Sequence, residues 1–202
     1  MDEDTATEGG FPANPFQDWA GRAYADGGVA ASCLALQERH GLDVNLVLWC
    51  CWLAASGRGP ADRDLLAKAM QAVAPWHGAV VRVLRRVRQE LKGGYPPVPA
   101  AVVAALRDRT LGLEIDCERA EQLVLLEETP PAAPEPGEDD AGACLGPAAR
   151  GLGVLFELYG VEPGEADFED LAVLLPGCFS VPGADAEAAL AAAGWPRGPG
   201  QQ

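Results

Sequence analysis

The side chains that most often perform catalysis are scarce in this sequence. Its two histidines are His40 and His77, and its three serines are Ser32, Ser56 and Ser180. No serine lies in a G-x-S-x-G turn, no G-x-G-x-x-G opens a helix after a strand pattern, and the sequence has no P-loop. We therefore predict no catalytic residue, no metal site and no cofactor.

The two histidines could still meet Cys50 in the folded chain, where they would hold a metal or transfer a proton. The simpler interpretation gives both of them structural positions. His40 closes a predicted helix, where a partly cationic imidazole suits the helix dipole, and His77 lies on a helix beside Trp76.

The cysteines are more numerous but contain no C-x-x-C pair. No secretory signal is visible before them, so we interpret them as reduced thiols of a cytoplasmic protein, mostly small core residues. They are Cys33, Cys50, Cys51, Cys117, Cys144 and Cys178.

Aromatic and amide side chains suggest a possible ligand pocket. Its apolar walls and polar edge would come from six residues, Tyr24, Gln37, His40, Asn45, Trp49 and Trp52. The alternative is that the aromatic rings fill the core, while Gln37 and Asn45 form a buried polar clamp that fixes how two helices cross. The sequence favours the core and the clamp.

Two charged segments could bind partners. Arg82, Arg85 and Arg86 form a basic face that could bind a phosphate, an acidic protein or nucleic acid. The sequence favours instead a solvated face, or one that receives the acidic C-terminal segment of the same chain. An acidic segment carries the apolar anchors of a helix that binds in a partner's groove, with docking on its own chain as the alternative. These anchors are Phe168, Leu171, Leu174 and Leu175.

The elements that must position these residues are helices. One Ile, four Thr and three Tyr cannot furnish an extensive sheet, whereas Ala and Leu dominate the chain. Apolar spacing predicts an all-α fold, an irregular bundle with helices over about 15–24, 29–40, 44–55, 61–73, 75–92, 99–109 and 116–128. The helix over 44–55 is apolar on every side, so we place it at the centre of the bundle. Gly41 ends the preceding helix, and Asp43 caps this one.

Composition divides the predicted chain into four parts. Residues 1–14 form a disordered acidic N-terminus, 15–128 the helical domain, and 129–147 a Pro/Gly/acidic linker. Residues 148–202 form a short helical appendage, with weak helices over about 148–159, 165–175 and 184–193 before a Gly/Pro tail. The longest apolar stretch, residues 46–55, would span roughly 15 Å as a helix, so we expect no membrane partner.

The residues around the central helix resemble a small proteobacterial family of uncharacterised proteins. Its members share the core L-Q-x-x-x-G-x-D-V-N-L-L-L-x-C-x-W-L, which this chain matches through Leu36-Gln37, Gly41-x-Asp43-Val44-Asn45-Leu46-x-Leu48-x-Cys50 and Trp52-Leu53. The resemblance is specific from Phe16 to about Gly57 and extends to about Glu128. It implies one helical domain of a bacterial cytoplasmic protein and carries no activity with it.

The leading hypothesis for the function is a non-enzymatic protein-interaction or adaptor module. The alternative is a small-ligand-binding protein or enzyme that uses the aromatic pocket with Gln37, His40 and Asn45. Nucleic-acid binding ranks last, because the chain carries a net charge of −15 and only residues 58–109 have a basic excess, with ten basic and four acidic residues.

Overall fold

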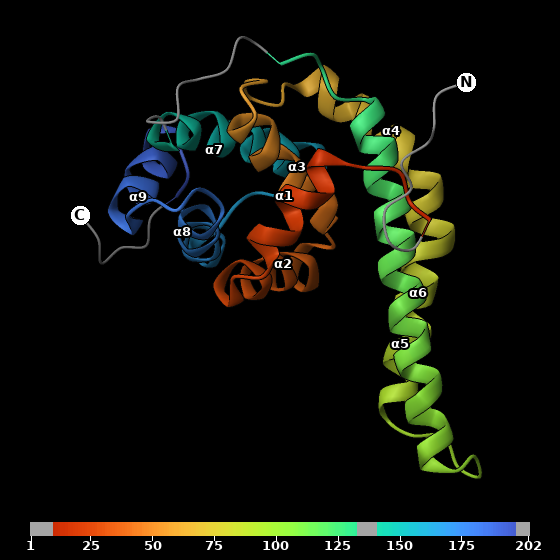
Figure 1. Ribbon diagram of the computed structural model, residues 1–202. Helices are drawn as coiled ribbons and strands as arrows, with labels where there is room; N and C mark the ends of the chain where they lie inside the picture. The colour runs from red at the N-terminus through yellow and green to blue at the C-terminus, as the bar shows by residue number, and fades with distance from the viewer. Residues whose placement is uncertain (1–9, 133–140, 197–202) are drawn as a thin grey trace, which may run out of the picture. The chain divides into compact units, whose positions relative to one another are not determined.

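The regular structure of the chain is helical, as predicted. The computed structural model describes residues 10–132 and 141–196, and no β-strand occurs within those ranges. Figure 1 labels the helices. They are α1 (Pro15–Tyr24), α2 (Gly27–His40), α3 (Val44–Ala55), α4 (Arg63–Trp76), the π-helix η1 (His77–Val81), α5 (Arg82–Lys92), α6 (Ala100–Glu127), α7 (Ala141–Leu158), α8 (Glu165–Phe179) and α9 (Gly183–Ala192).

The chain forms two compact units, and their boundaries differ from the predicted domains. The bundle unit takes in residues 15–68 and the described residues from Glu128 onward, whereas the hairpin unit takes in residues 69–127 and 10–14. The predicted division at residue 128 therefore fails, because the C-terminal helices complete the core of the first helices. Of the other predicted segments, residues 1–9, 133–140 and 197–202 lie outside the described ranges.

The bundle unit is built around α3, which confirms the predicted central helix. Every residue from Asn45 to Ala54 is buried, and α1, α2, α7 and α8 all pack against this helix. Two local hydrogen bonds define where α3 starts. The backbone N–H of Gly41 donates to Gln37 O at 2.8 Å with Gly41 at φ 70°, and Asp43 Oδ1 accepts from Asn45 N at 2.9 Å.

The C-terminal helices are part of the bundle and not an appendage. Helix α7 packs along α3, α8 packs along α2, and α9 contacts both α7 and α8. Their apolar side chains are fully buried, including Leu152, Phe156 and Leu171. Apolar residues on α7 and α8 therefore supply two of the walls that an all-apolar central helix requires.

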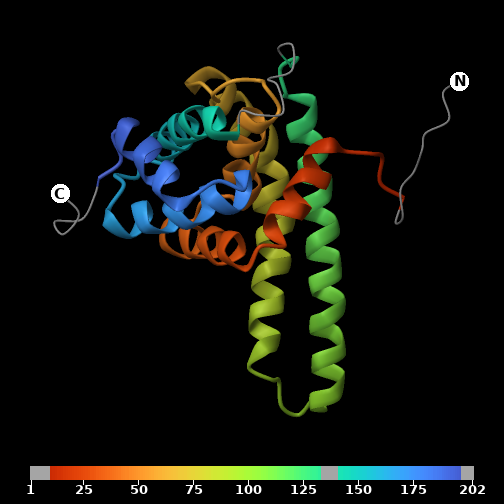
Figure 2. The same ribbon diagram turned by 60° about the vertical axis from the view of Figure 1, so that its left-hand side comes forward.

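The hairpin unit contains two antiparallel helices. Figures 1 and 2 both show α5 and α6 side by side, joined at one end by residues 93–99. Two predicted helices, over 99–109 and 116–128, are here the single helix α6, and the predicted helix over 75–92 begins earlier because α4, η1 and α5 follow one another without a break. None of the described helices is long and apolar enough to cross a membrane.

Candidate functional site

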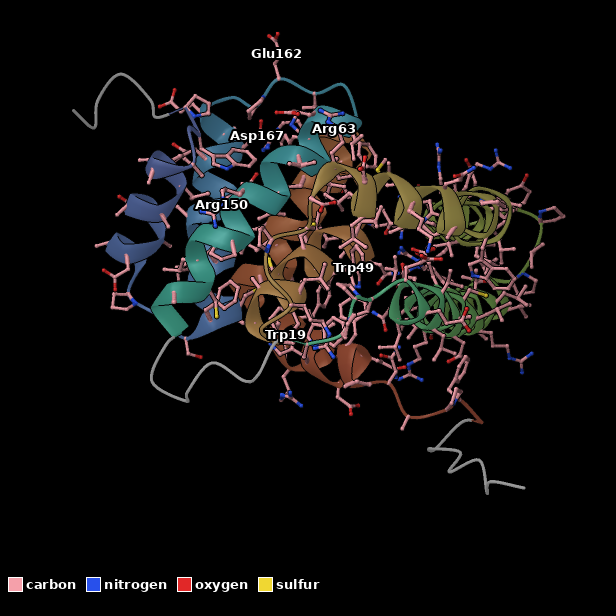
Figure 3. The ribbon with its side chains drawn as sticks, turned by 90° about the horizontal axis from the view of Figure 1, so that it is seen from above. Trp19, Trp49, Arg63, Arg150, Glu162 and Asp167 are labelled. Carbon is pink, nitrogen blue, oxygen red and sulfur yellow. The ribbon has the colours of Figure 1, made fainter. Side chains whose placement is uncertain are left out.

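A cluster of charged side chains joins α2 to α8 inside the bundle unit. Arg39 Nη1 donates to Asp167 Oδ1 at 2.5 Å, and Arg39 Nη2 donates to Asp170 Oδ2 at 2.9 Å. His40 Nε2 lies 2.7 Å from the same Asp167 Oδ1. We call these four residues the α2–α8 clasp; Figure 3 labels Asp167 within it.

The carboxylate of Asp167 is the centre of the clasp. Its side chain is 3% exposed, and its Oδ2 accepts the Gly164 backbone N–H at 2.8 Å at the start of α8. Burial raises the pKa of this carboxyl, but the hydrogen bonds from Gly164, His40 and Arg39 outweigh burial and hold the pKa below its ordinary value. Asp167 is therefore a fixed anion that binds the two helices together.

The six predicted pocket residues make contacts in different places. His40 packs its ring edge on Phe156, with centroids 5.5 Å apart, in addition to its bond with Asp167. Trp49 Nε1 donates to Thr129 Oγ1 at 3.1 Å, whereas Trp52 stacks against Phe16. The pocket and the clamp between Gln37 and Asn45 stay predictions, with Asn45 buried, Gln37 half-buried and Tyr24 exposed.

The apolar anchors predicted to bind a partner's groove point into the bundle unit. All four are buried, so they are not exposed to a partner in this structure. They are Phe168, Leu171, Leu174 and Leu175. The alternative of docking on the same chain describes what α8 does, but its acidic residues bind α2 through the clasp.

The predicted basic face is split in the hairpin unit. Arg85 turns toward α6, where its Nε donates to Glu114 Oε1 at 3.0 Å and its Nη2 donates to Glu118 Oε1 at 2.7 Å. Arg82 and Arg86 are exposed. Arg85 is therefore paired within the hairpin unit, and binding of a partner by Arg82 and Arg86 stays a prediction.

Glu114 is buried between two arginines of α5. Arg88 Nε donates to its Oε2 at 2.5 Å, beside the bond from Arg85. Burial raises the pKa of Glu114, but the bonds from Arg88 and Arg85 outweigh burial and keep the pKa below its ordinary value. These ion pairs lie between α5 and α6.

A second histidine–carboxylate contact lies at the π-helix. His77 Nδ1 is 3.1 Å from Glu121 Oε2, whose side chain is completely buried, and Trp76 Nε1 donates to Cys117 O at 2.9 Å. Sequence reasoning missed Glu121, because a glutamate on an amphipathic helix is ordinarily exposed to solvent. Its spacing from Glu114 and Cys117 is the signal that could have found it, since three and four residues place all of them on one stripe.

An exposed apolar surface lies on the α5–α6 pair, and sequence reasoning missed it too. Seven large apolar side chains on these two helices are between 39% and 52% exposed, and five of the seven lie away from Arg85 and Glu118 around their helices. We call them the hairpin face: Val83, Val87, Val102, Leu106 and Leu113.

The angles around each helix place the five side chains away from Arg85 and Glu118. At 3.6 residues per turn, Val83 and Val87 lie about 160° round α5 from Arg85, and the three α6 residues lie about 120–160° round from Glu118. Because Arg85 and Glu118 bond to each other between the two helices, the residues of the hairpin face point away from this ion pair on each helix.

The cysteines of the bundle unit are protonated core residues. Cys33, Cys50 and Cys51 are buried, and none of the six cysteines forms a disulfide. Burial raises the pKa of Cys50 to about 12 and also raises that of Cys33. A hydrogen bond with Cys178, together with burial, raises the pKa of Cys51. Such thiols are poor nucleophiles.

The fold and these surfaces define an all-helical protein with a clasped bundle and an amphipathic hairpin. The sequence profile of the DUF2390 family, described as a protein of unknown function, matches residues 16–125, which is more than half of the chain. The protein belongs to this family, and the matched range agrees with the extent of the resemblance found in the sequence. No curated protein and no solved structure gives a significant match.

Proposed function

We propose that the protein is an interaction module that binds another polypeptide chain through the hairpin face. One observation carries this proposal: five of the seven large apolar side chains exposed on α5 and α6 point away from the ion pairs that Arg85 makes with Glu114 and Glu118. Single exposed apolar residues are ordinary on a protein surface, but several at helical spacing on two neighbouring helices are typical of a binding surface.

The spacing of the exposed residues also indicates a helical ligand. The α5 residues Val83 and Val87 are four positions apart, and the α6 residues Val102 and Leu106 repeat that spacing. This is the spacing with which one amphipathic helix packs its side chains against others. A helical ligand would therefore bury aliphatic side chains worth about 1.5–3 kcal/mol each when covered completely.

Photocrosslinking tests the proposal directly. A photoreactive phenylalanine analogue replaces Val87 in the full chain, and a matched variant carries it at Leu111, which is equally exposed but lies within about 60° of Glu118 on the other side of α6. We expect an adduct with a polypeptide from position 87 and not from position 111. The substitution Leu113→Glu should remove that adduct, because it puts a charge into the same surface.

Equal adducts from both positions, or none from either, would overturn the proposed function. An adduct from position 87 that survives Leu113→Glu would do so too, because it would not depend on the hairpin face.

A further inference from the structure

We infer that Cys51 and Cys178 form an oxidation site, at which a hydroperoxide converts the two thiols into a disulfide that joins α3 to α8. The site lies in the bundle unit and does not involve the hairpin face, so its failure would leave the proposed function untouched. Three observations carry the inference: the contact between the two thiols, the difference in their exposure, and the packing of the helices around them.

The two thiols come from segments that are distant in the sequence. Cys51 belongs to α3, and Cys178 lies in the last turn of α8, 127 positions later. The two helices contact each other in the bundle unit, and a hydrogen bond joins the two thiol groups. Thiols held in contact meet the first condition for a disulfide, whose sulfur–sulfur bond is about 2 Å long.

The different exposure of the two thiols sets the order of the reaction. Cys178 is half-buried, so a small oxidant can reach its sulfur from solvent. Cys51 is completely buried and can react only with groups that the protein places beside it. Cys178 is therefore the thiol that reacts with the hydroperoxide, and Cys51 is the thiol that then forms the disulfide.

Two steps account for every atom when the oxidant is hydrogen peroxide. In the first step the Cys178 sulfur bonds to one peroxide oxygen, the O–O bond breaks, and water leaves behind a sulfenic acid. In the second step the Cys51 sulfur bonds to the Cys178 sulfur and the S–O bond breaks. The hydroxyl group leaves with the thiol proton as a second water. The two thiols lose two electrons, and the peroxide gains them.

Close packing keeps the two thiols together. Gly177, the residue before Cys178, lies so close to α2 that a Cβ atom there would overlap Cγ2 of Val29, and Phe179 on the other side is buried. The end of α8 is therefore fixed on both sides of Cys178. The protonated thiol of Cys51 reacts slowly with molecules in solution, but beside Cys178 it acts at the high effective concentration of a neighbouring group.

Two other buried cysteines provide the alternatives against which the site is tested. Cys33 of α2 interacts electrostatically with both thiols, but the hydrogen bond selects Cys51 as the partner of Cys178. Cys50 directly precedes Cys51, yet its side chain leaves α3 about 100° away around the helix. Because Cys50 is as completely buried as Cys51, it is the matched control.

The first test maps the disulfide. The purified full chain is treated with excess hydrogen peroxide, its remaining thiols are alkylated, and it is digested with trypsin for mass spectrometry. We expect one linked pair of peptides that contain Cys51 and Cys178, and an intact chain lighter by two hydrogen atoms before alkylation. Cys51→Ala and Cys178→Ala should each abolish the link, whereas Cys50→Ala should keep it.

The second test measures the effect of the link on stability. A disulfide between residues so far apart in the chain constrains the unfolded state, so oxidation should raise the denaturant concentration at the unfolding midpoint. A thiol reductant should reverse that rise, and Cys50→Ala should show it while Cys51→Ala and Cys178→Ala should not. Circular dichroism confirms that each variant keeps its helix content. Cys178→Ala, at the half-buried position, serves alone if Cys51→Ala loses helix.

Four results would overturn the inference. They are a disulfide from Cys178 to Cys33, a link that survives Cys51→Ala, a link between two separate chains, and a Cys178 that either stays reduced or is oxidised further to the sulfinic acid while Cys51 remains a thiol. Each of these results would show that the contact between the two thiols does not lead to a bond between them.

Discussion

The strongest single-residue anchor in the bundle unit is the carboxylate of Asp167. It accepts bonds from one backbone N–H and from two side chains of α2, while almost none of its surface is exposed. A buried anion is unfavourable unless such partners form hydrogen bonds with it. Replacing the carboxylate therefore measures how much the complete polar network contributes to stability.

Asp167→Asn should therefore lower the free energy of unfolding by about 1–3 kcal/mol, because a neutral amide cannot accept from Arg39, His40 and the backbone as an anion does. Denaturant unfolding measures this change. Glu165→Gln, a neighbouring acidic residue that is exposed at the start of α8, is the matched control and should shift stability by less than about 0.5 kcal/mol. Equal effects from the two substitutions would contradict the role given to the clasp.

The same residue makes stability depend on pH in one direction. The pKa of Asp167 is lower in the folded chain than its ordinary value of 3.8, so its contribution is present above that value and is lost as the pH falls through the lower folded pKa. Acid unfolding of the wild type should steepen below about pH 4. Asp167→Asn should make that slope shallower, whereas a variant with an unchanged acid limb would count against the lowered pKa.

Glycine at position 177 lets α8 approach α2 closely. A Cβ atom there would overlap Cγ2 of Val29, a completely buried β-branched side chain that cannot rotate away at low cost. Gly177→Ala should lower the free energy of unfolding by about 1–3 kcal/mol through overpacking.

Two further variants make the Gly177 result specific. Gly153→Ala, within α7 where a Cβ would meet no atom within 4 Å, should be neutral or stabilising by about 0.5–1 kcal/mol. Val29→Ala should remove most of the additional penalty of Gly177→Ala in a double-mutant cycle. Purely additive effects would show that the close approach is not the cause.

At the scale of elements, the sequence predicts helices well where apolar period and caps agree. Helix α3 is apolar throughout, and Gly41 and Asp43 fix its approach, so both its bounds and its burial were predictable. Helix α6 was predicted as two pieces because its buried stripe contains Glu114 and Glu121. Hydrophobic period alone cannot reveal a stripe whose members are buried glutamates neutralised by residues far away in the chain.

The functional surfaces were harder to predict than the helices for the same reason. Val83 and Val87 share the spacing of a core stripe, and only the position of the neighbouring helix decides which side of α5 is covered. Arg85 looks like a solvated cation in the sequence, yet its partner Glu114 lies 29 residues away. Long-range partners such as this one, or His40 with Asp167, have no signature in local composition.

At the scale of the whole molecule, the acidic residues and the buried core residues are distributed differently along the chain. The residues after Glu128 look like an acidic extension by composition, but α7 and α8 contribute some of the most completely buried side chains of the bundle unit. The acidic character stays on the outside of these helices, with Asp167 and Asp170 as the exceptions that bind α2. Composition therefore describes the surface of the C-terminal segment and not its place in the fold.

A truncation tests this dependence of the bundle on its C-terminal helices. Ending the chain after residue 132 removes α7, α8 and α9. Helix α3 then loses the helix α7 that packs along it, and Arg39 and His40 lose their contacts with Asp167. Because α3 is apolar on every side, the remaining helices cannot bury it, and we expect loss of the cooperative thermal transition together with binding of a hydrophobic dye. Ending the chain after residue 196 removes none of these contacts and should keep the wild-type transition. A chain of residues 1–132 that still unfolds cooperatively, with no gain in dye binding, would show that the first helices cover α3 without help.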